Sequence, residues 1–153
     1  MRTIEIKTVP PTDPDLHMLI ERLDRELLTL YPAEGIFGVD FNDPAVREMT
    51  FCVAYACGTP AGCGGFKPLE EDVAELKRFY VESSFRSKGI ASLILEYIES
   101  AAKESGVKVM RLETGPKQPA AIALYRKFGY RQIECYGPYA GCEHSLCMEK
   151  PLE

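Results

Sequence analysis

The residues of this sequence that are best suited to bind an anion lie in a short turn, Arg86-Ser-Lys-Gly-Ile-Ala91. The turn brings two positive charges, while Gly89 and Ala91 leave its backbone uncovered by long side chains. Apolar residues recur after it at spacings of three and four, which predicts a helix that stops at Gly106. A helix that starts at such a turn presents unpaired N–H groups and the positive end of its dipole. The spacing therefore predicts a phosphate-binding turn.

The pattern of glycines excludes two common phosphate-binding loops. The mononucleotide loop, G-x-x-x-x-G-K-[ST], is absent, since Lys88 precedes its glycine. The glycine cluster at residues 62–65 is followed by Phe66-Lys-Pro68, so it indicates a glycine-rich strand and not the start of a helix in a dinucleotide-binding fold. What remains is R-x-x-G-x-A after a strand.

A second segment further along the chain adds to this pattern. It runs Gln118-Pro-Ala-Ala-Ile-Ala-Leu-Tyr125-Arg-Lys-Phe-Gly-Tyr130 and is similar to N-x-x-A-x-x-L-Y-x-x-x-G-[FY], with Gln118 where asparagine is usual. Together with R-x-x-G-x-A and the acidic strand segment Ala74-Glu-Leu76, it resembles the GNAT superfamily of N-acetyltransferases, whose loop reads [QR]-x-x-G-x-[GA]. The matching segments run from Val73 to Tyr130 in the order and separation typical of that family.

The resemblance implies an enzyme that uses acetyl-CoA as its acyl donor. In this family the turn holds the pyrophosphate of the cofactor, and the strand before it pairs with the pantetheine arm. The cofactor-binding residues predicted in this way are Phe79, Tyr80, Val81, Arg86, Ser87, Lys88, Gly89, Ile90, Ala91, Ser92 and Gln118.

For deprotonation of an amine, the resemblance points first to Glu75, acting directly or through a water molecule. Partial burial would raise the pKa of this carboxyl and make it a better base near neutral pH. The residues alone also allow a plainer interpretation, in which Glu75 pairs with Lys77 or Arg111 on a solvated sheet face. Glu113, on the adjoining predicted strand, is the second candidate for the base.

For protonation of the leaving thiolate, Tyr125 matches the tyrosine that lies beside the cofactor sulfur in many members of the superfamily. A phenol has a pKa of about 10 and keeps its proton at pH 7. The alternative is a tyrosine that packs through its ring with its hydroxyl bonded to the backbone. A backbone N–H near Tyr80 or Val81 is the candidate for stabilising the oxyanion.

Direct attack within a ternary complex meets these needs without an acyl-enzyme. A cysteine nucleophile would need a neighbouring base, and neither His17 nor His144 has a spacing to a cysteine that indicates one. We interpret His144 as a residue of a hairpin.

The acceptor is expected to lie between two loops. In the family its pocket is shaped by the first helix with the following loop and by a hairpin near the chain end, which here are residues 31–43 and 136–144. A small primary amine is the preferred acceptor. A protein lysine or N-terminal amine is one alternative, and a non-catalytic acyl-CoA-binding or sensing module is another. The candidate acceptor-binding residues are Glu34, Asp40, Glu113, Tyr136 and Tyr139.

The elements that must position these residues alternate along the chain without a linker or repeat. Strands before and after two long crossover helices predict an α/β fold with a mixed, mostly antiparallel sheet flanked by helices on both faces, which is also the order of the GNAT fold. After a first strand at Ile4 and Ile6, strands are expected at 51–57, 62–67, 73–81, 109–114, 130–136 and 145–149, and helices at 14–30, 89–106 and 119–128.

Length and composition agree with one domain over residues 1–153. The chain has 153 residues of which 46% are hydrophobic, enough to bury a normal core. The formal charge of −5 argues against non-specific nucleic-acid binding. No stretch is apolar enough to cross a membrane, and the charges at the start of the chain are unlike a signal peptide, so a cytoplasmic protein is expected.

The six cysteines are spaced unlike a zinc site, and no metal is expected. A homodimer formed through the terminal strands is compatible with the resemblance.

Overall fold

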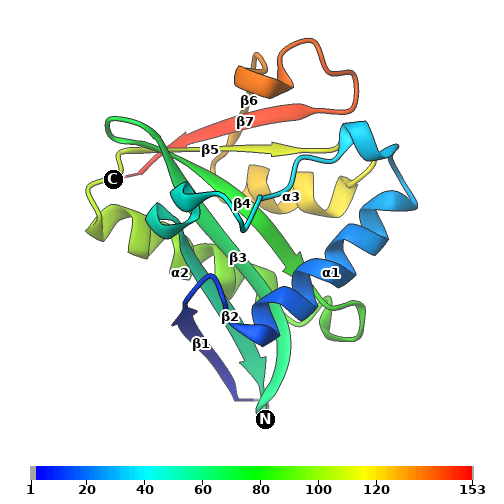
Figure 1. Ribbon diagram of the computed structural model, residues 1–153, viewed down its shortest axis with the longest axis vertical. Helices are drawn as coiled ribbons and strands as arrows, with labels where there is room; N and C mark the ends of the chain where they lie inside the picture. The colour runs from blue at the N-terminus through cyan, green and yellow to red at the C-terminus, as the bar shows by residue number, and fades with distance from the viewer. Residues whose placement is uncertain (1–2, 153) are drawn as a thin grey trace.

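A seven-stranded sheet in the order β1-β2-β3-β4-β5-β7-β6 forms the centre of the molecule (Figure 1). The computed structural model describes residues 3–152. The first two residues of the charged segment at the start of the chain lie outside this range. All neighbouring strands are antiparallel except β4 and β5, which confirms the expected mixed, mostly antiparallel sheet. The strands are β1 (Ile4–Val9), β2 (Thr50–Ala56), β3 (Thr59–Glu70), β4 (Val73–Val81), β5 (Val109–Thr114), β6 (Arg131–Ile133) and β7 (Leu146–Pro151).

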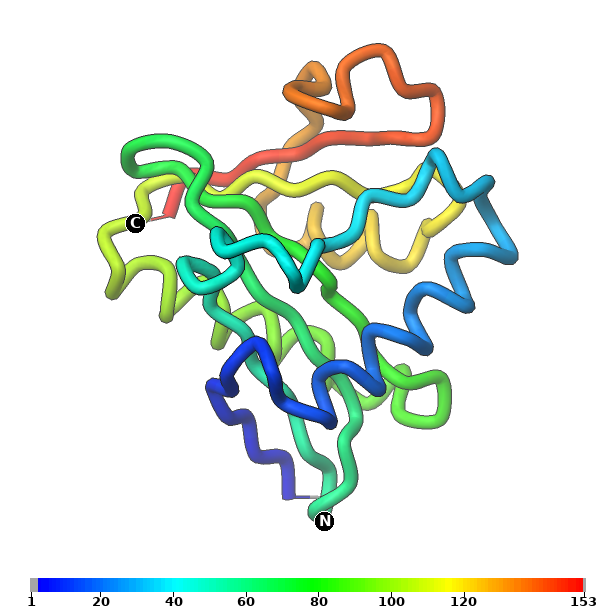
Figure 2. The backbone as a smooth tube through the Cα atoms, viewed as in Figure 1, coloured from blue at the N-terminus to red at the C-terminus, as the bar shows by residue number. Residues whose placement is uncertain are grey.

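Helices cover both faces of this sheet. The helix α1 (Pro14–Leu28) lies on one face together with the segment 31–49, whereas α2 (Ile90–Glu104) and α3 (Pro119–Lys127) lie on the other (Figures 1 and 2). Asp13 caps α1, because its carboxylate accepts a hydrogen bond from the Leu16 N–H at 3.0 Å. Short 3₁₀ turns occur at Ala33–Gly35, Pro44–Glu48, Ser83–Phe85 and Gly137–Tyr139.

The core is divided between the two faces. Leu16 and Leu19 of α1 are fully buried on one side, and Ile94 and Ile98 of α2 are buried on the other. The glycine-rich part of β3 allows α2 to approach closely, since a Cβ at Gly64 would lie only 2.7 Å from the Ile98 Cδ1 atom. The glycine cluster therefore has a packing role in a strand, as its sequence context indicates.

A β-bulge interrupts β4 near its end. Cys63 pairs with Tyr80 whereas Gly65 pairs with Lys77, so β4 has one more residue than β3 in this interval. Arg78 lies in the bulge with a φ of +54°, which is uncommon for a residue other than glycine. A bulge of this kind redirects the side chains around it.

The strands β4 and β5 separate halfway along their length. They pair only from Val73 to Leu76 on β4 and from Val109 to Leu112 on β5. Beyond that point β5 pairs only with β7, and the last part of β4 has β3 as its one neighbour. The last part of β4 therefore runs away from β5 (Figure 1).

Two strands differ in length from the sequence-based expectation. The strand expected at 130–136 is limited to Arg131–Ile133, because Tyr136 turns inward to donate a hydrogen bond to Glu75 and the chain then enters the 3₁₀ turn Gly137–Tyr139. The strand expected at 62–67 extends over Thr59–Glu70.

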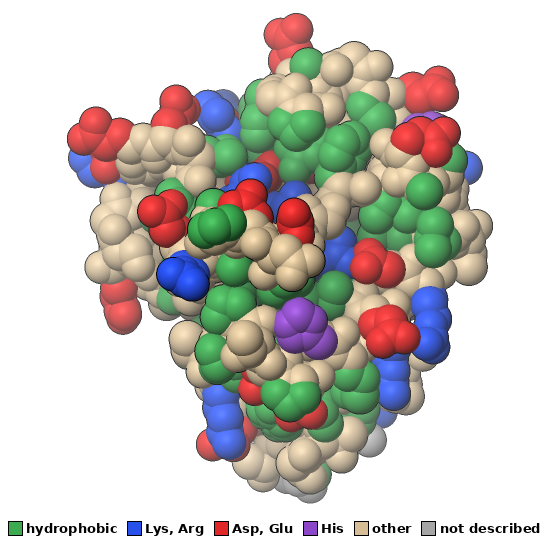
Figure 3. Space-filling view, viewed as in Figure 1, with side chains coloured by type: hydrophobic (Ala, Val, Ile, Leu, Met, Phe, Trp, Pro, Cys, Tyr) green, Lys and Arg blue, Asp and Glu red, His purple; other side chains and the backbone are tan. Residues whose placement is uncertain are grey.

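On the face seen in Figure 3, acidic and basic side chains are interspersed and neither sign forms a continuous patch. None of the helices within residues 3–152 combines the length and apolar character that a membrane span requires.

Candidate active site

A groove of about 540 Å³ opens between the end of β4 and the start of α2. Every residue that the sequence predicts to bind the cofactor lines this groove except Lys88. The ammonium group of Lys88 instead donates to the Ser84 carbonyl at 3.3 Å and lies 5.9 Å from the centre of the Phe85 ring. The structure therefore brings the two sequence motifs, Arg86–Ser92 and Gln118, to one surface.

The backbone N–H groups at the start of α2 are not capped by a side chain and lie along this groove. Gly89 is the N-cap residue with a φ of +82°, and no side chain caps the helix. Because the first N–H groups of a helix have no partner within it, those of α2 are left for an acceptor such as a phosphate. The residues present thus fit a phosphate-bearing ligand.

Arg86 is held at the edge of the groove by several contacts. Its Nε donates to the Val81 carbonyl at 2.9 Å, and its Nη2 lies 2.7 Å from the Glu26 carboxylate. The guanidinium group also lies 5.7 Å from the centre of the Tyr80 ring. These contacts fix the positive charge beside the first turn of α2.

A second hollow, the inner cavity, has a volume of about 100 Å³ and adjoins the groove. The two spaces share the wall formed by Leu23, Phe79, Gln118 and Ala121, so a ligand in the groove would end beside the inner cavity. The polar side chains that line the inner cavity are Tyr31, Arg78, Glu113, Thr114, Gln118, Tyr125 and His144.

Glu113 is the acidic residue of the inner cavity. It follows Leu112, the last residue of β5 that pairs with β4, so it lies where the two strands separate. Burial raises the pKa of Glu113 to about 7, although the Ser145 hydroxyl, which donates to the carboxylate at 2.8 Å, and the nearby Lys77 both lower it. A carboxyl group with a pKa near 7 is well matched to general-base catalysis at neutral pH.

Tyr125 lies in the same cavity with a phenol that keeps its proton. It comes from α3, is only 5% exposed, and packs against the rings of Phe79 and Tyr130 at centroid distances of 5.9 and 5.8 Å. Burial raises the pKa of Tyr125, with Glu113 adding to the effect. Within residues 3–152 its hydroxyl makes no hydrogen bond, and the oxygen itself is not fully buried, unlike that of the packed and bonded tyrosine that was the alternative.

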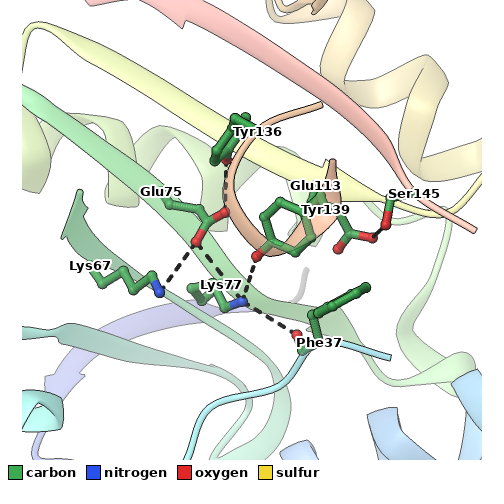
Figure 4. A network of polar contacts seen from close by, with 8 residues as sticks. All are labelled: Phe37, Lys67, Glu75, Lys77, Glu113, Tyr136, Tyr139 and Ser145. Atoms are coloured by element: carbon green, nitrogen blue, oxygen red, sulfur yellow. Dashed lines mark hydrogen bonds and ion pairs between the residues drawn. The ribbon is translucent and has the colours of Figure 1, made fainter. Parts of the chain in front are cut away.

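Glu75 lies outside both the groove and the inner cavity, in a network of polar contacts (Figure 4). It is 1% exposed, accepts a hydrogen bond from the Tyr136 hydroxyl at 2.7 Å, and lies 3.7 Å from the Lys67 and 4.0 Å from the Lys77 ammonium nitrogen. The contact with Lys77 is the one that the plainer interpretation allowed, but Glu75 is buried and does not lie on a solvated sheet face, and Arg111 forms ion pairs with Glu70 and Glu149 instead. Of the two carboxylates named as candidate bases, the structure places Glu113 beside Tyr125.

The network around Glu75 joins the two loops predicted to shape the acceptor pocket. Lys77 donates to the Phe37 carbonyl at 3.3 Å and to the Tyr139 hydroxyl at 3.0 Å, and the Tyr139 ring packs edge-on against Phe37 and Tyr136 (Figure 4). Tyr136 and Tyr139 therefore anchor the loops and do not line the inner cavity.

The two acidic residues predicted to attract the acceptor lie elsewhere. Glu34 is exposed in the 3₁₀ turn Ala33–Gly35 and does not line the inner cavity. Asp40 lines a separate hollow of about 240 Å³ beside Lys67 and Lys77.

Four polar residues of the inner cavity were not singled out as site residues from the sequence, namely Tyr31, Arg78, Thr114 and His144. Tyr31 accepts a hydrogen bond from the Lys117 N–H at 2.8 Å, and His144 packs edge-on against the Tyr31 ring at a centroid distance of 6.0 Å. His144 was interpreted only as a hairpin residue, and no local pattern marks Arg78, which reaches the cavity from the bulge of β4.

Comparisons with known proteins agree with this geometry. The model of the Acetyltransferase (GNAT) family matches residues 16–130. An IAA acetyltransferase from Azospirillum brasilense is 39% identical over 99% of this chain and 100% of its own length. A crystal structure from Klebsiella pneumoniae, assigned as an acyl-CoA N-acyltransferase, is 31% identical with a TM-score of 0.87 and covers 99% of both chains. The PaiA N-acetyltransferase of Thermoplasma acidophilum, solved in complex with coenzyme A, shares the fold at 22% identity, a TM-score of 0.72 and coverage of 97% of this chain and 99% of its own.

A mixed sheet whose two parallel strands separate, with an uncapped helix start along a groove, fits a protein that binds a phosphate-bearing ligand. The chain belongs to the GNAT family of acetyltransferases.

Proposed function

We propose that this protein transfers an acetyl group from acetyl-CoA to the primary amine of a small molecule, by direct attack within a ternary complex. The observation that carries the proposal is that the groove at the start of α2 adjoins a cavity that holds a carboxyl group with a pKa near 7 and a protonated phenol. The similarity to an IAA acetyltransferase and the shared fold with a coenzyme A complex support it.

The groove residues bind the donor in this proposal. The N–H groups of the first turn of α2, together with Arg86, hold the pyrophosphate. The pantetheine arm binds along Phe79, Tyr80 and Val81, on the edge of β4 that no longer pairs with β5. When bound, acetyl-CoA supplies an acyl group activated as a thioester.

Glu113 is the base in this proposal. The acceptor amine reaches the inner cavity as an ammonium ion, and Glu113 takes one proton so that the nitrogen lone pair is free to attack. Its pKa of about 7 keeps a large fraction of the carboxyl ionised at neutral pH while leaving it basic enough to accept the proton. Glu75, whose carboxylate is already bonded to Tyr136 and faces two lysines, is assigned to holding the loops.

Tyr125 is the acid that protonates the departing thiolate. Replacing Tyr125 by Phe removes the donor and keeps the ring, so we expect kcat to fall by about 10²-fold with little change in acetyl-CoA affinity. Steady-state kinetics and a binding titration of the same variant measure the two effects. Tyr97→Phe is the matched control, because within residues 3–152 the Tyr97 hydroxyl bonds only to Thr8, which lies in the edge strand β1. An unchanged kcat in Tyr125→Phe would remove Tyr125 from the mechanism.

The small volume of the inner cavity, about 100 Å³, supports a small acceptor over a large one. All six cysteines are free, as is usual in a reducing compartment, and on this basis we place the reaction in the cytoplasm.

The proposal is tested by calorimetric titration with acetyl-CoA. We expect saturable binding, weakened at least about 10²-fold in Gly89→Glu, which sets a carboxylate at the helix start where the phosphates bind. Gly106→Glu is the matched control, because Gly106 follows the other end of α2 with a similar φ of +90° and equal free space.

A second pair of variants tests the positive charge. Arg86→Ala is expected to weaken binding, whereas Arg25→Ala, on the exposed face of α1, is expected to leave it unchanged. If the wild-type protein does not bind acetyl-CoA, the proposed function is wrong.

A further inference from the structure

The Nε atom of Arg78 is buried and has no hydrogen-bond partner. Among the fully buried side-chain nitrogen and oxygen atoms of residues 3–152, it is the one in this state. The residue is 6% exposed, lines the inner cavity, and uses its Nη2 atom in an ion pair with Asp24. A buried N–H without a partner has lost its bonds to water and gained none in return, so such groups in native proteins call for an explanation.

The backbone at Arg78 is also unusual. Arg78 has a φ of +54° and lies in the β4 bulge, and its long cationic side chain lines the inner cavity. A regular β4 without the extra residue would avoid the conformational cost of this positive φ. Strained residues of this kind cluster at binding sites. Two independent observations, the unpaired Nε and the bulge, thus point to a ligand for this guanidinium group.

We propose that the acceptor amine carries a carboxylate group, as a small amino acid does, and that Arg78 binds it. The inference rests on the proposed function and names the substrate class of the same site. Guanidinium groups are the preferred partners of carboxylates, because their planar array of N–H donors matches the two oxygens. A carboxylate at Arg78 would give the unpaired Nε an acceptor.

The charges of the inner cavity match such a zwitterion. Arg78 comes from β4 and Glu113 from β5, so the separation of the strands sets a positive and an acidic group on two sides of one small space. Leu23, Leu27 and Ile36 supply apolar wall for a side chain. A protein lysine or N-terminal residue has an amide in place of this carboxylate and would leave the Arg78 Nε without an anionic acceptor.

The test compares matched pairs of acceptors that differ only in the carboxylate. Leucine with isoamylamine, methionine with 3-(methylthio)propylamine, and phenylalanine with phenethylamine are each offered with acetyl-CoA, and release of the coenzyme A thiol is followed. We expect kcat/KM to be about 10²-fold higher for the carboxylated member of the best pair, as one charge-assisted pair of hydrogen bonds predicts.

The variants locate the effect at Arg78. In Arg78→Met the ratio of kcat/KM within a pair is expected to fall to about one, and in Arg78→Lys, which keeps the charge without the planar fork, it is expected to fall about 10-fold. Arg22→Met is the matched control: it breaks an ion pair between α1 and Glu82, close to the end of β4 but outside the inner cavity, and should keep the ratio. If Arg78→Met does not fold, the lysine variant and the wild-type ratios decide.

The outcomes distinguish failure of the acceptor proposal at Arg78 from failure of the proposed acetyltransferase function. A wild-type protein that acetylates the decarboxylated amines as well as the amino acids, or a ratio that survives in Arg78→Met, overturns the role of Arg78 and leaves the acetyltransferase proposal intact. Binding of acetyl-CoA without acetylation of any pair overturns this acceptor class. Absence of acetyl-CoA binding overturns the proposed function itself.

Discussion

Replacing Glu113 by Gln is expected to lower kcat by about 10²- to 10⁴-fold, the usual contribution of a general base. The substitution keeps the shape of the side chain and an oxygen that accepts from the Ser145 hydroxyl, so it removes the basic group and little else. Steady-state kinetics with a saturating amine measure the loss. Acetyl-CoA affinity is expected to be retained, because Glu113 does not line the groove.

The pH dependence of the wild-type enzyme also tests whether Glu113 is the base. The base must be ionised to act, and the pKa of Glu113 is raised to about 7 by burial. We therefore expect kcat/KM to rise with pH over roughly one unit on each side of that value, and the rise to be missing in Glu113→Gln. A rising limb that persists in Glu113→Gln but disappears in Glu75→Gln would restore Glu75 as the base.

The same carboxyl group makes a prediction about stability. Its pKa in the folded protein, about 7, exceeds the ordinary value of 4.5, so folding favours the protonated form. The stability that it contributes is fully present below about pH 4.5 and is lost as the pH rises through about 7. Glu113→Gln should thus be more stable than the wild type at pH 8 by about 3 kcal/mol and similar to it near pH 4, as measured by denaturant unfolding.

Replacing Glu75 by Ala is expected to lower the free energy of unfolding by about 3–5 kcal/mol. The substitution leaves the Tyr136 hydroxyl without its acceptor and the Lys77 ammonium group buried without a counter-charge. Burial already lowers the pKa of Lys77, and Glu75 is the main group that opposes this effect. Urea unfolding at pH 7 measures the loss.

Controls separate the buried network from an ordinary surface ion pair. Glu70→Ala breaks the contact of an exposed carboxylate with Arg111, 3.6 Å away, and should cost no more than about 0.5 kcal/mol. The double variant Glu75→Gln with Lys77→Met removes both buried charges and should recover much of the loss. A cost at Glu75 as small as that at Glu70 would contradict the assignment of Glu75 to the network.

The network also has a consequence for activity. Because Glu75 and Lys77 fasten Phe37 of one loop and Tyr136 and Tyr139 of the other, loosening them should raise KM for the amine more than it changes acetyl-CoA affinity. The pattern would differ from that of Glu113→Gln, in which the loss falls mainly on kcat.

The sequence by itself determined the fold class, the family and the groove, because these depend on local patterns. A run of Arg86, Gly89 and Ala91 before a periodic apolar helix fixes where α2 begins, and the second motif fixes α3 with Gln118 and Tyr125. Helix starts depend on neighbouring residues, so their geometry could be predicted without knowledge of distant contacts. The same reasoning predicted the glycine-rich strand of β3.

Only the tertiary structure decided which carboxylate lies beside Tyr125. Glu75 lies opposite Arg111 in the backbone register where β4 and β5 run together, whereas Glu113 comes just after Leu112, where the two strands part. The bulge that directs Arg78 into the inner cavity likewise appears only when β3 and β4 are in register. Strand register and separation depend on pairing between residues far apart in the chain, and a single strand sequence does not specify them.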